Sequence, residues 1–233
     1  MTINSRVLTV IPTYKECENL TLLIPELLNL KLGLDILVVD DFSNDGTIQL
    51  IETLRITYGE SVKVISRHEE ASYAKSLIQG IKFGIANGYS TVIQLDADGS
   101  HAPKDVNKLI EAKGDVVIGS RYVRNSKVIN VPLRRQAYSI LGNIYISLIW
   151  KSRVRDKTNG FRLFRTDALR ILDEFNVSSL GFAVQIQTLK LISKNKKIRI
   201  SEVPTEFVFR QIGNSKFDLK KLLEALIITT KSV

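Results

Sequence analysis

The chain has 233 residues, of which 44% are hydrophobic and 24% charged, so it can bury a full core and is neither disordered nor fibrous. Its 33 Lys and Arg residues outnumber its 24 Asp and Glu residues, and the net charge of +9 indicates an anionic partner: nucleic acid, an acidic membrane surface or a phosphorylated small molecule. The single cysteine excludes an internal disulfide, and no apolar run reaches the roughly 18 residues of a membrane span. Because the N-terminus also lacks the layout of a signal peptide, we expect an intracellular chain that does not cross a bilayer.

The first half alternates between short apolar runs and helical patterns. The runs predict strands at residues 7–11, 36–39, 62–65, 91–95 and 116–119, and the patterns between them predict helices at about 18–30, 47–55 and 71–86 and a short helix opened by Pro103. This alternation is typical of an α/β protein with a Rossmann-like, mostly parallel sheet and helices on both faces. Ligands then bind at the carboxyl ends of the strands.

From Arg121 onward a basic polar loop (121–135) precedes an apolar helical stretch at about 138–150. That stretch is either a buried helix or an interfacial helix lying on a bilayer, and the amphipathic pattern at 217–228 poses the same question. We interpret the apolar runs at 160–164 and 198–209 as edge strands. We expect one domain over 1–233, in which residues 121–216 elaborate the sheet of 1–120 and 217–233 form a C-terminal helix.

Two acidic clusters follow predicted strands. Asp96-Ala97-Asp98-Gly99 alone is typical of an ordinary turn. A second pair, Asp40 and Asp41, occupies the same kind of place after another apolar run. Because the carboxyl ends of parallel strands meet at one edge, the two clusters predict a shared, cation-binding crevice.

Three segments follow one another in the chain: Val10–Glu16, Val39–Thr47, and Asp96–Asp98 with His101 and Pro103. In this order they resemble the family 2 glycosyltransferases of the GT-A fold, which use a nucleotide-sugar donor and usually a divalent metal. Four later segments are Ile118–Val123, Asp156–Arg162, Gly181–Ile186 and Val203–Lys216. This second set is similar to the dolichyl-phosphate mannosyltransferase branch. The match runs from about residue 6 to 217, and the Gln-x-x-Arg-Trp signature of processive polysaccharide synthases is absent.

On the donor side, the resemblance implies that Asp98, and Asp96 directly or through water, hold Mg²⁺ or Mn²⁺ against the departing diphosphate. It implies that Tyr14 packs on the base while carboxylates accept hydrogen bonds from base or ribose. Asp40 is as readily structural as functional. The donor-binding set is Pro12, Tyr14, Glu16, Asp41, Asp96 and Lys216.

On the acceptor side, a lipid phosphate with a second pKa near ~6 is already a competent nucleophile, so no strong general base is required. The resemblance implies that Arg121, Arg135 and Ser139 grip this phosphate and that Arg210 lies near the transferring groups. The expected catalytic set is therefore Asp96, Asp98, Arg121 and Arg210. Other basic residues are expected on a surface facing lipid headgroups: Arg124, Lys127, Arg134, Lys151 and Arg153.

The chain departs from this branch at four places. Ser72–Ser76 stands where relatives carry a Gly-Leu-Gly stretch, which should change how the backbone approaches the donor. Ser100 stands where a Gln often helps to hold the metal, Gln187 replaces a common Glu, and Lys15 replaces a common Asn.

The sequence as a whole predicts an inverting, metal-dependent hexose transfer to dolichyl or polyprenyl phosphate. GDP-mannose is the first donor and UDP-glucose the alternative. A nucleotidyltransferase would normally show a Gly-rich phosphate loop, which Pro12-Thr13-Tyr14 is not, and a non-catalytic nucleotide-sugar-binding module remains a rival. We expect no nucleic-acid partner. The expected location is peripheral, at the cytoplasmic face of a membrane, through direct contact, through a membrane-anchoring partner protein, or as a piece of a longer chain.

Overall fold

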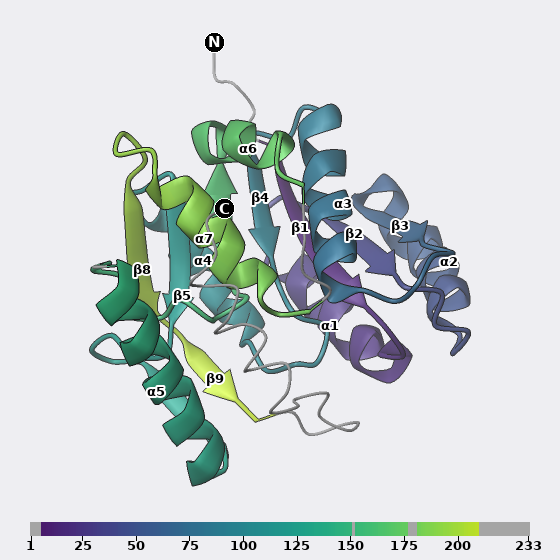
Figure 1. Cartoon of the computed structure of the whole chain (residues 1–233). Helices are drawn as coiled ribbons and strands as arrows, with labels where there is room; N and C mark the ends of the chain where they lie inside the picture. Colours follow the sequence, from purple (N-terminus) through teal and green to yellow (C-terminus); the bar gives the residue numbers. More distant parts are fainter. Residues whose placement is uncertain (1–5, 151, 177–180, 210–233) are drawn as a thin grey trace.

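The structure, a computed structural model, describes residues 6–150, 152–176 and 181–209. Its centre is a seven-stranded sheet of order β3-β2-β1-β4-β7-β5-β8, in which only β7 runs antiparallel to its neighbours (Figure 1). The strands are β1 (Val7–Thr13), β2 (Leu34–Asp40), β3 (Val62–Ser66), β4 (Thr91–Gln94), β5 (Val116–Ser120), β7 (Arg162–Arg165) and β8 (Ile200–Pro204). The predicted mostly parallel sheet and its first five strands are therefore confirmed.

The expectation that residues 160–164 form an edge strand is wrong, because β7 lies between β4 and β5. An apolar run whose side chains are buried on both faces belongs to the interior of a sheet, and Phe161, Leu163 and Phe164 are all buried. The second run divides: β8 is an edge strand, whereas β9 (Glu206–Val208) pairs with β6 (Lys127–Ile129) in a separate two-stranded sheet. The basic loop thus contains a strand that its composition did not indicate.

Helices cover both faces of the sheet, as predicted (Figure 1). The first face carries α1 (Cys17–Asn29), α2 (Thr47–Tyr58) and α4 (Val106–Glu111), which follows a short 3-10 turn at Pro103–Asp105; another such turn, Gly59–Ser61, follows α2. The second face carries α3 (Tyr73–Ala86), α6 (Thr166–Asp173) and α7 (Val184–Ser193). Side chains of β2 divide between these layers by alternation, with Ile36 and Val38 on the first face and Leu37 and Val39 on the second.

Helix α5 (Leu133–Trp150) lies apart from these layers and buries few of its residues (Figure 1). Its buried positions are Gly142, Asn143 and Ile146. Large hydrophobic side chains on the rest of the helix are exposed, with Leu141 at 61% and Leu148 at 75%. Within the described residues no helix is both long and apolar enough to cross a membrane. The expected tail helix at 217–228 lies outside the described residues.

Candidate active site

The candidate side chains gather at the carboxyl ends of the parallel strands. Asp40 ends β2, Asp96 follows β4 by two residues, and Arg121 directly follows β5. Burial lowers the pKa of the Arg121 guanidinium, but the Asp156 carboxylate and, to a smaller extent, the charge of Asp96 raise it above its ordinary value. The shared edge that the two acidic clusters predict therefore exists, and it also includes the first arginine of the acceptor set.

The Asp96 carboxylate is held on its protein side by Tyr73. The Tyr73 hydroxyl donates to Asp96 Oδ1 at 2.7 Å, and its oxygen accepts from Gln94 Nε2 and Gln185 Nε2 at 2.9 Å each. Burial, followed by the charge of Asp96, raises the pKa of Tyr73 well above its ordinary value, so the hydroxyl remains a donor. His101 Nε2 lies 3.5 Å from Asp96 Oδ2.

The Asp-x-Asp segment is a turn as well as a carboxylate pair. Gly99 has a φ of +69°, and Asp98 Oδ1 accepts the Ser100 backbone N–H at 3.1 Å. His101 is 1% exposed and stacks on Phe161, which agrees with a role in shaping the loop. The turn interpretation and the functional one are thus compatible.

The two carboxylates suit a cation that completes its shell elsewhere. Among the described residues no group of three or more His, Cys, Asp and Glu side chains is placed to hold a metal ion. A hard ion such as Mg²⁺ or Mn²⁺ takes oxygen ligands and accepts several from substrate phosphate and water. Asp96 and Asp98 fit that arrangement, because two carboxylates cannot by themselves fill the coordination shell of the ion.

Asp41 is more enclosed than expected of a nucleoside ligand. It is 5% exposed, and its carboxylate accepts from Arg67, from the Ser72 backbone N–H at 2.9 Å and from Ser76 Oγ at 2.7 Å. Asp40 accepts the Ser43 N–H at 3.0 Å, which ties its carboxylate to the loop after β2. The nucleoside role of Asp41 stays a prediction, and the geometry shows that this carboxylate also fixes the start of α3.

The loops after β1 and β2 are joined to each other. Lys15, at a φ of 57°, donates its backbone N–H to Ser43 Oγ at 2.7 Å, and its ammonium lies 5.3 Å from the Tyr14 ring centroid. Pro12 is buried within β1. Glu16 accepts from Asn19 Nδ2 at 2.6 Å. Pro12, Tyr14 and Glu16 thus extend from the end of β1 to the start of α1, and their contact with a donor stays a prediction.

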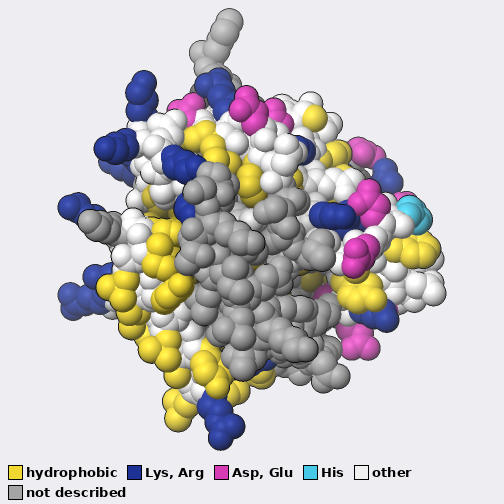
Figure 2. All heavy atoms as spheres, in the orientation of Figure 1, with side chains coloured by type: hydrophobic (Ala, Val, Ile, Leu, Met, Phe, Trp, Pro, Cys, Tyr) yellow, Lys and Arg dark blue, Asp and Glu magenta, His cyan; other side chains and the backbone are white. Residues whose placement is uncertain are grey.

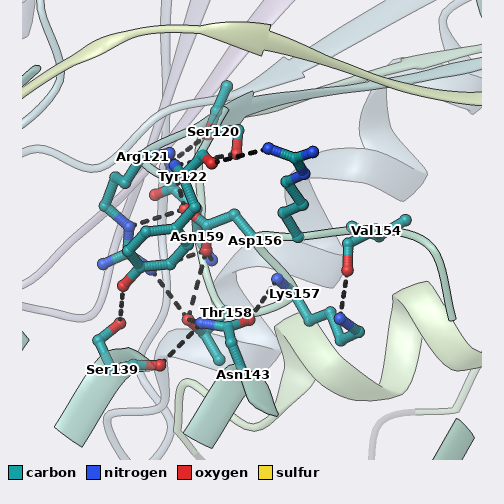
Figure 3. Close-up of polar contacts among 12 residues, drawn as sticks. Ser120, Arg121, Tyr122, Ser139, Asn143, Val154, Asp156, Lys157, Thr158 and Asn159 are labelled. Carbon is teal, nitrogen blue, oxygen red and sulfur yellow. Dashed lines mark hydrogen bonds and ion pairs between the residues drawn. The ribbon is translucent and has the colours of Figure 1, made fainter. Parts of the chain in front are cut away.

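Arg121 forms a bidentate ion pair with Asp156, which the motif spacing did not predict (Figure 3). Its Nε and Nη2 donate to the two carboxylate oxygens of Asp156 at 2.8 Å each, and Nη2 also donates to Thr158 Oγ1 at 2.9 Å. Burial raises the pKa of the Asp156 carboxyl, but the charge and hydrogen bonds of Arg121 outweigh it and leave that pKa below its ordinary value. Within the described residues Nη1 of Arg121 has no hydrogen-bond partner, so one end of the fork remains for a ligand.

One face of α5 docks on this ion pair (Figure 3). Tyr122 donates its hydroxyl to Ser139 Oγ at 2.7 Å, and Asn143 Nδ2 donates to Thr158 Oγ1 at 3.1 Å. Asn143 Oδ1 accepts the Lys157 backbone N–H at 2.7 Å. Arg135, on the same helix, lies with its guanidinium 5.1 Å from the Phe209 ring centroid. The structure thus places Ser139 beside the Arg121 loop, while Arg210 and Lys216 lie outside the described residues.

Sequence reasoning missed three supporting residues: Tyr73, Asn143 and Asp156. The sequence does carry a signal for Asp156, because it is the single acidic residue in the basic stretch 151–157. Arg162 was also unmarked; it is fully buried and donates to the backbone oxygens of Lys157 and Gln185 at 2.7 and 2.6 Å. Burial lowers its pKa to about 10.

Comparison with known proteins adds independent findings. A family model described as glycosyl transferase family 2 matches residues 9–172. The chain is 37% identical over 228 residues to undecaprenyl-phosphate mannosyltransferase from Micrococcus luteus, covering 97% of this chain and 93% of that protein. It is 36% identical over 224 residues to polyprenol monophosphomannose synthase from Mycolicibacterium smegmatis, covering 95% and 84%.

A solved structure shows the same fold. Glucosyl-3-phosphoglycerate synthase from Mycobacterium tuberculosis, in complex with Mn²⁺, UDP-glucose and phosphoglyceric acid, matches with a TM-score of 0.68 at 17% identity, over 97% of this chain and 79% of that chain. At this identity the likeness concerns the fold alone. The described residues therefore have the GT-A fold that the sequence predicts.

Proposed function

The chain belongs to glycosyl transferase family 2 and is a glycosyltransferase, and we propose that it transfers mannose from GDP-mannose to a polyprenyl phosphate with inversion at the sugar carbon. The observation that carries the proposal is that the carboxylates of Asp96 and Asp98 lie at the same edge of the sheet as Arg121, whose Nε and Nη2 are paired with Asp156. The names of the two relatives are the reason for ranking mannose before glucose.

On the donor side, Asp98 and Asp96 would hold Mg²⁺ or Mn²⁺, which when bound offsets negative charge on the departing diphosphate. Glycosyltransferase structures with Mn²⁺ and UDP support a metal of this kind. Pro12, Tyr14, Glu16 and Asp41 would line the nucleoside site. Lys216 would add to it from outside the described residues.

On the acceptor side, Arg121 would bind the phosphate through Nη1, because Asp156 and Thr158 occupy its other edge. Arg135 and Ser139 would complete the grip, and Arg210 would lie near the transferring groups. A phosphate oxygen then attacks the anomeric carbon as the bond from that carbon to the diphosphate oxygen breaks. The products are a mannosyl monophospholipid and a nucleoside diphosphate, and no proton needs to be removed from the nucleophile.

We also propose that α5 rests on the membrane that holds the acceptor. Figure 2 shows hydrophobic side chains gathered over α5, with Lys and Arg side chains at the rims. A helix with an exposed apolar side and basic flanks suits the interface of an anionic bilayer. Of the basic residues expected on this surface, Arg124, Lys127, Arg134 and Arg153 are exposed, and Lys151 lies outside the described residues.

The activity is tested by incubating the protein with labelled GDP-mannose or UDP-glucose, Mn²⁺ or Mg²⁺, and a short polyprenyl phosphate. We expect label in the organic phase from GDP-mannose, and loss of transfer when EDTA is added. Transfer from UDP-glucose alone would replace mannose by glucose in the proposal. A folded protein that transfers neither sugar would overturn it.

The membrane contact is tested with vesicles of neutral and anionic phospholipid. The double substitution Leu141→Glu and Leu148→Glu removes two exposed apolar side chains, each worth about 1.5–3 kcal/mol when fully buried, and should weaken sedimentation with anionic vesicles at least about tenfold. Ile56→Glu, an 88% exposed hydrophobic residue on α2, is the matched control. Equal binding by both variants would instead favour a membrane-anchoring partner.

A further inference from the structure

The first turn of α3 contacts both acidic clusters of the site. Ser72, which caps the helix, donates its backbone N–H to Asp41 Oδ2, and Ser76 donates its hydroxyl to Asp41 Oδ1. Tyr73, on the same turn, donates its hydroxyl to Asp96 Oδ1. Residues 72–76 are one of the four places at which this chain departs from the resemblance to its family, and hydroxyl groups stand there where that resemblance implies glycine.

We propose that Tyr73 is a positioning residue that orients Asp96 for the divalent cation. Ser76 instead orients Asp41 for the nucleoside, and it does not affect the metal site. The inference rests on the proposed function, because it takes Asp96 as part of the metal site and Asp41 as part of the nucleoside site.

The Tyr73 hydroxyl has one hydrogen-bond acceptor for its proton, the Asp96 carboxylate. Gln94 Nε2 and Gln185 Nε2 both donate to the oxygen, so the O–H is directed at Asp96. The two amides come from different elements, the end of β4 and the start of α7, which fixes the hydroxyl from two sides. The Phe182 ring lies 4.5 Å from the Tyr73 ring and holds the ring in place.

Gly160 shows how little room this arrangement has. A Cβ at position 160 would lie 3.1 Å from each carboxylate oxygen of Asp96 and 3.1 Å from the Tyr73 hydroxyl. The carboxylate therefore lies against backbone on one side and against the tyrosine hydroxyl on another. Its remaining exposure, 20% of the side chain, is the part that can meet a ligand.

A carboxylate held this way binds a cation without first losing rotational freedom. Without the hydroxyl, Asp96 would lose the hydrogen bond that orients its Oδ1, and its contribution to the metal shell would fall. Loss of a hydrogen bond that orients a metal ligand typically costs 10–100-fold in metal affinity. Ser76 has no contact with Asp96 in the structure, so its loss should leave the metal affinity unchanged.

The test compares Tyr73→Phe with Ser76→Ala, two variants that each remove one hydroxyl from the same helical turn. The bound nucleotide is whichever of GDP and UDP the parent protein binds. Free Mn²⁺ is measured by electron paramagnetic resonance at saturating nucleotide, and nucleotide affinity is measured by calorimetry in EDTA. Tyr73→Phe should weaken Mn²⁺ binding about 10–100-fold and leave nucleotide affinity in EDTA within about twofold. Ser76→Ala should do the reverse, weakening the nucleotide severalfold and leaving Mn²⁺ unchanged.

Tyr73→Phe also removes the oxygen that accepts from the Gln94 and Gln185 amides, so a second variant is needed. Gly160→Ala retains the Tyr73 hydroxyl and displaces the Asp96 carboxylate. It should also weaken Mn²⁺ binding. Parental Mn²⁺ affinity in either folded variant, or equal losses in the Tyr73 and Ser76 variants, overturns the positioning role. If the parent binds neither nucleotide nor Mn²⁺, the proposed function fails first and the inference fails with it.

Discussion

The two charged centres of the site are supported in opposite ways. Asp96 is held by the hydroxyl of Tyr73, a group without charge, while Arg121 is held by a carboxylate that is itself fully buried. The first arrangement suits the capture of a cation. The second yields a pair without net charge, in which one edge of the guanidinium is already used.

If Arg121 binds the acceptor phosphate as proposed, this difference gives a reason for more than one arginine in the acceptor site. A phosphate monoester carries about −1.5 to −2 charge at neutral pH. Because Asp156 neutralises Arg121, the pair supplies direction through Nη1 but little net charge. Arg135, on α5, and Arg210, outside the described residues, are the proposed sources of the remaining positive charge.

The largest effect is expected at the carboxylate centre. Asp98→Asn keeps the size of the side chain and removes the charge that holds the cation, so kcat should fall about 10³- to 10⁴-fold, in line with the several kcal/mol that such an ion contributes. Initial rates of labelled mannose transfer at varied Mn²⁺ measure it. Asp167→Asn, at an exposed carboxylate of α6, should retain the parental rate. If Asp98→Asn retained it too, the carboxylate pair would be only a turn.

The arginine centre should respond in stability as well as in activity. Asp156→Asn leaves Arg121 without its counter-charge in a buried place, and removal of one partner of a buried pair costs about 3–5 kcal/mol. We expect about 3 kcal/mol, since Thr158 remains as a partner of Arg121. Urea unfolding measures the loss. Asp167→Asn breaks the exposed pair with Arg170 and should cost less than about 1 kcal/mol.

The same pair should determine part of the acid sensitivity. The pKa of Asp156 is lower in the folded chain than its ordinary value of 3.8, so its stabilisation is complete above that value and is lost as the pH falls through the lower folded pKa. The gap in unfolding free energy between the parent and Asp156→Asn should therefore narrow as the pH falls below about 4. A gap that does not depend on pH down to about 2 would contradict this account.

Local patterns predict the sheet edge but not the contacts across it. The runs before Asp40 and Asp96 identify strands because burial on both faces leaves a continuous apolar signature. Arg121 and Asp156 are 35 residues apart, and no local pattern encodes which carboxylate turns toward which guanidinium. The antiparallel insertion of β7 is hidden for the same reason, since a short buried run fits any place in a sheet.

Helices α6 and α7 were not predicted, and the site depends on one of them. α7 brings Gln185 to Tyr73 over a separation of 112 residues. Its buried face includes polar residues, among them Gln185, Gln187 and Thr188, which weakens the periodic apolar signal by which helices are recognised. Side chains used for the site thus made its supporting helix harder to identify.

The smallest predicted effect concerns how α5 supports Arg121. Asn143→Ala removes the amide that joins Thr158 and the Lys157 N–H, so the Arg121 loop should lose precision rather than charge. A lost hydrogen bond of this kind costs about 1 kcal/mol, which corresponds to about a fivefold rise in KM for the polyprenyl phosphate, with KM for the nucleotide sugar unchanged. Thr53→Ala removes an exposed hydroxyl of α2 that donates to the Gln49 carbonyl oxygen one turn back, and it should stay within about twofold of the parent for both substrates. Equal rises in both KM values for Asn143→Ala would mean that α5 supports the whole sheet edge, and the two centres would then not be supported independently.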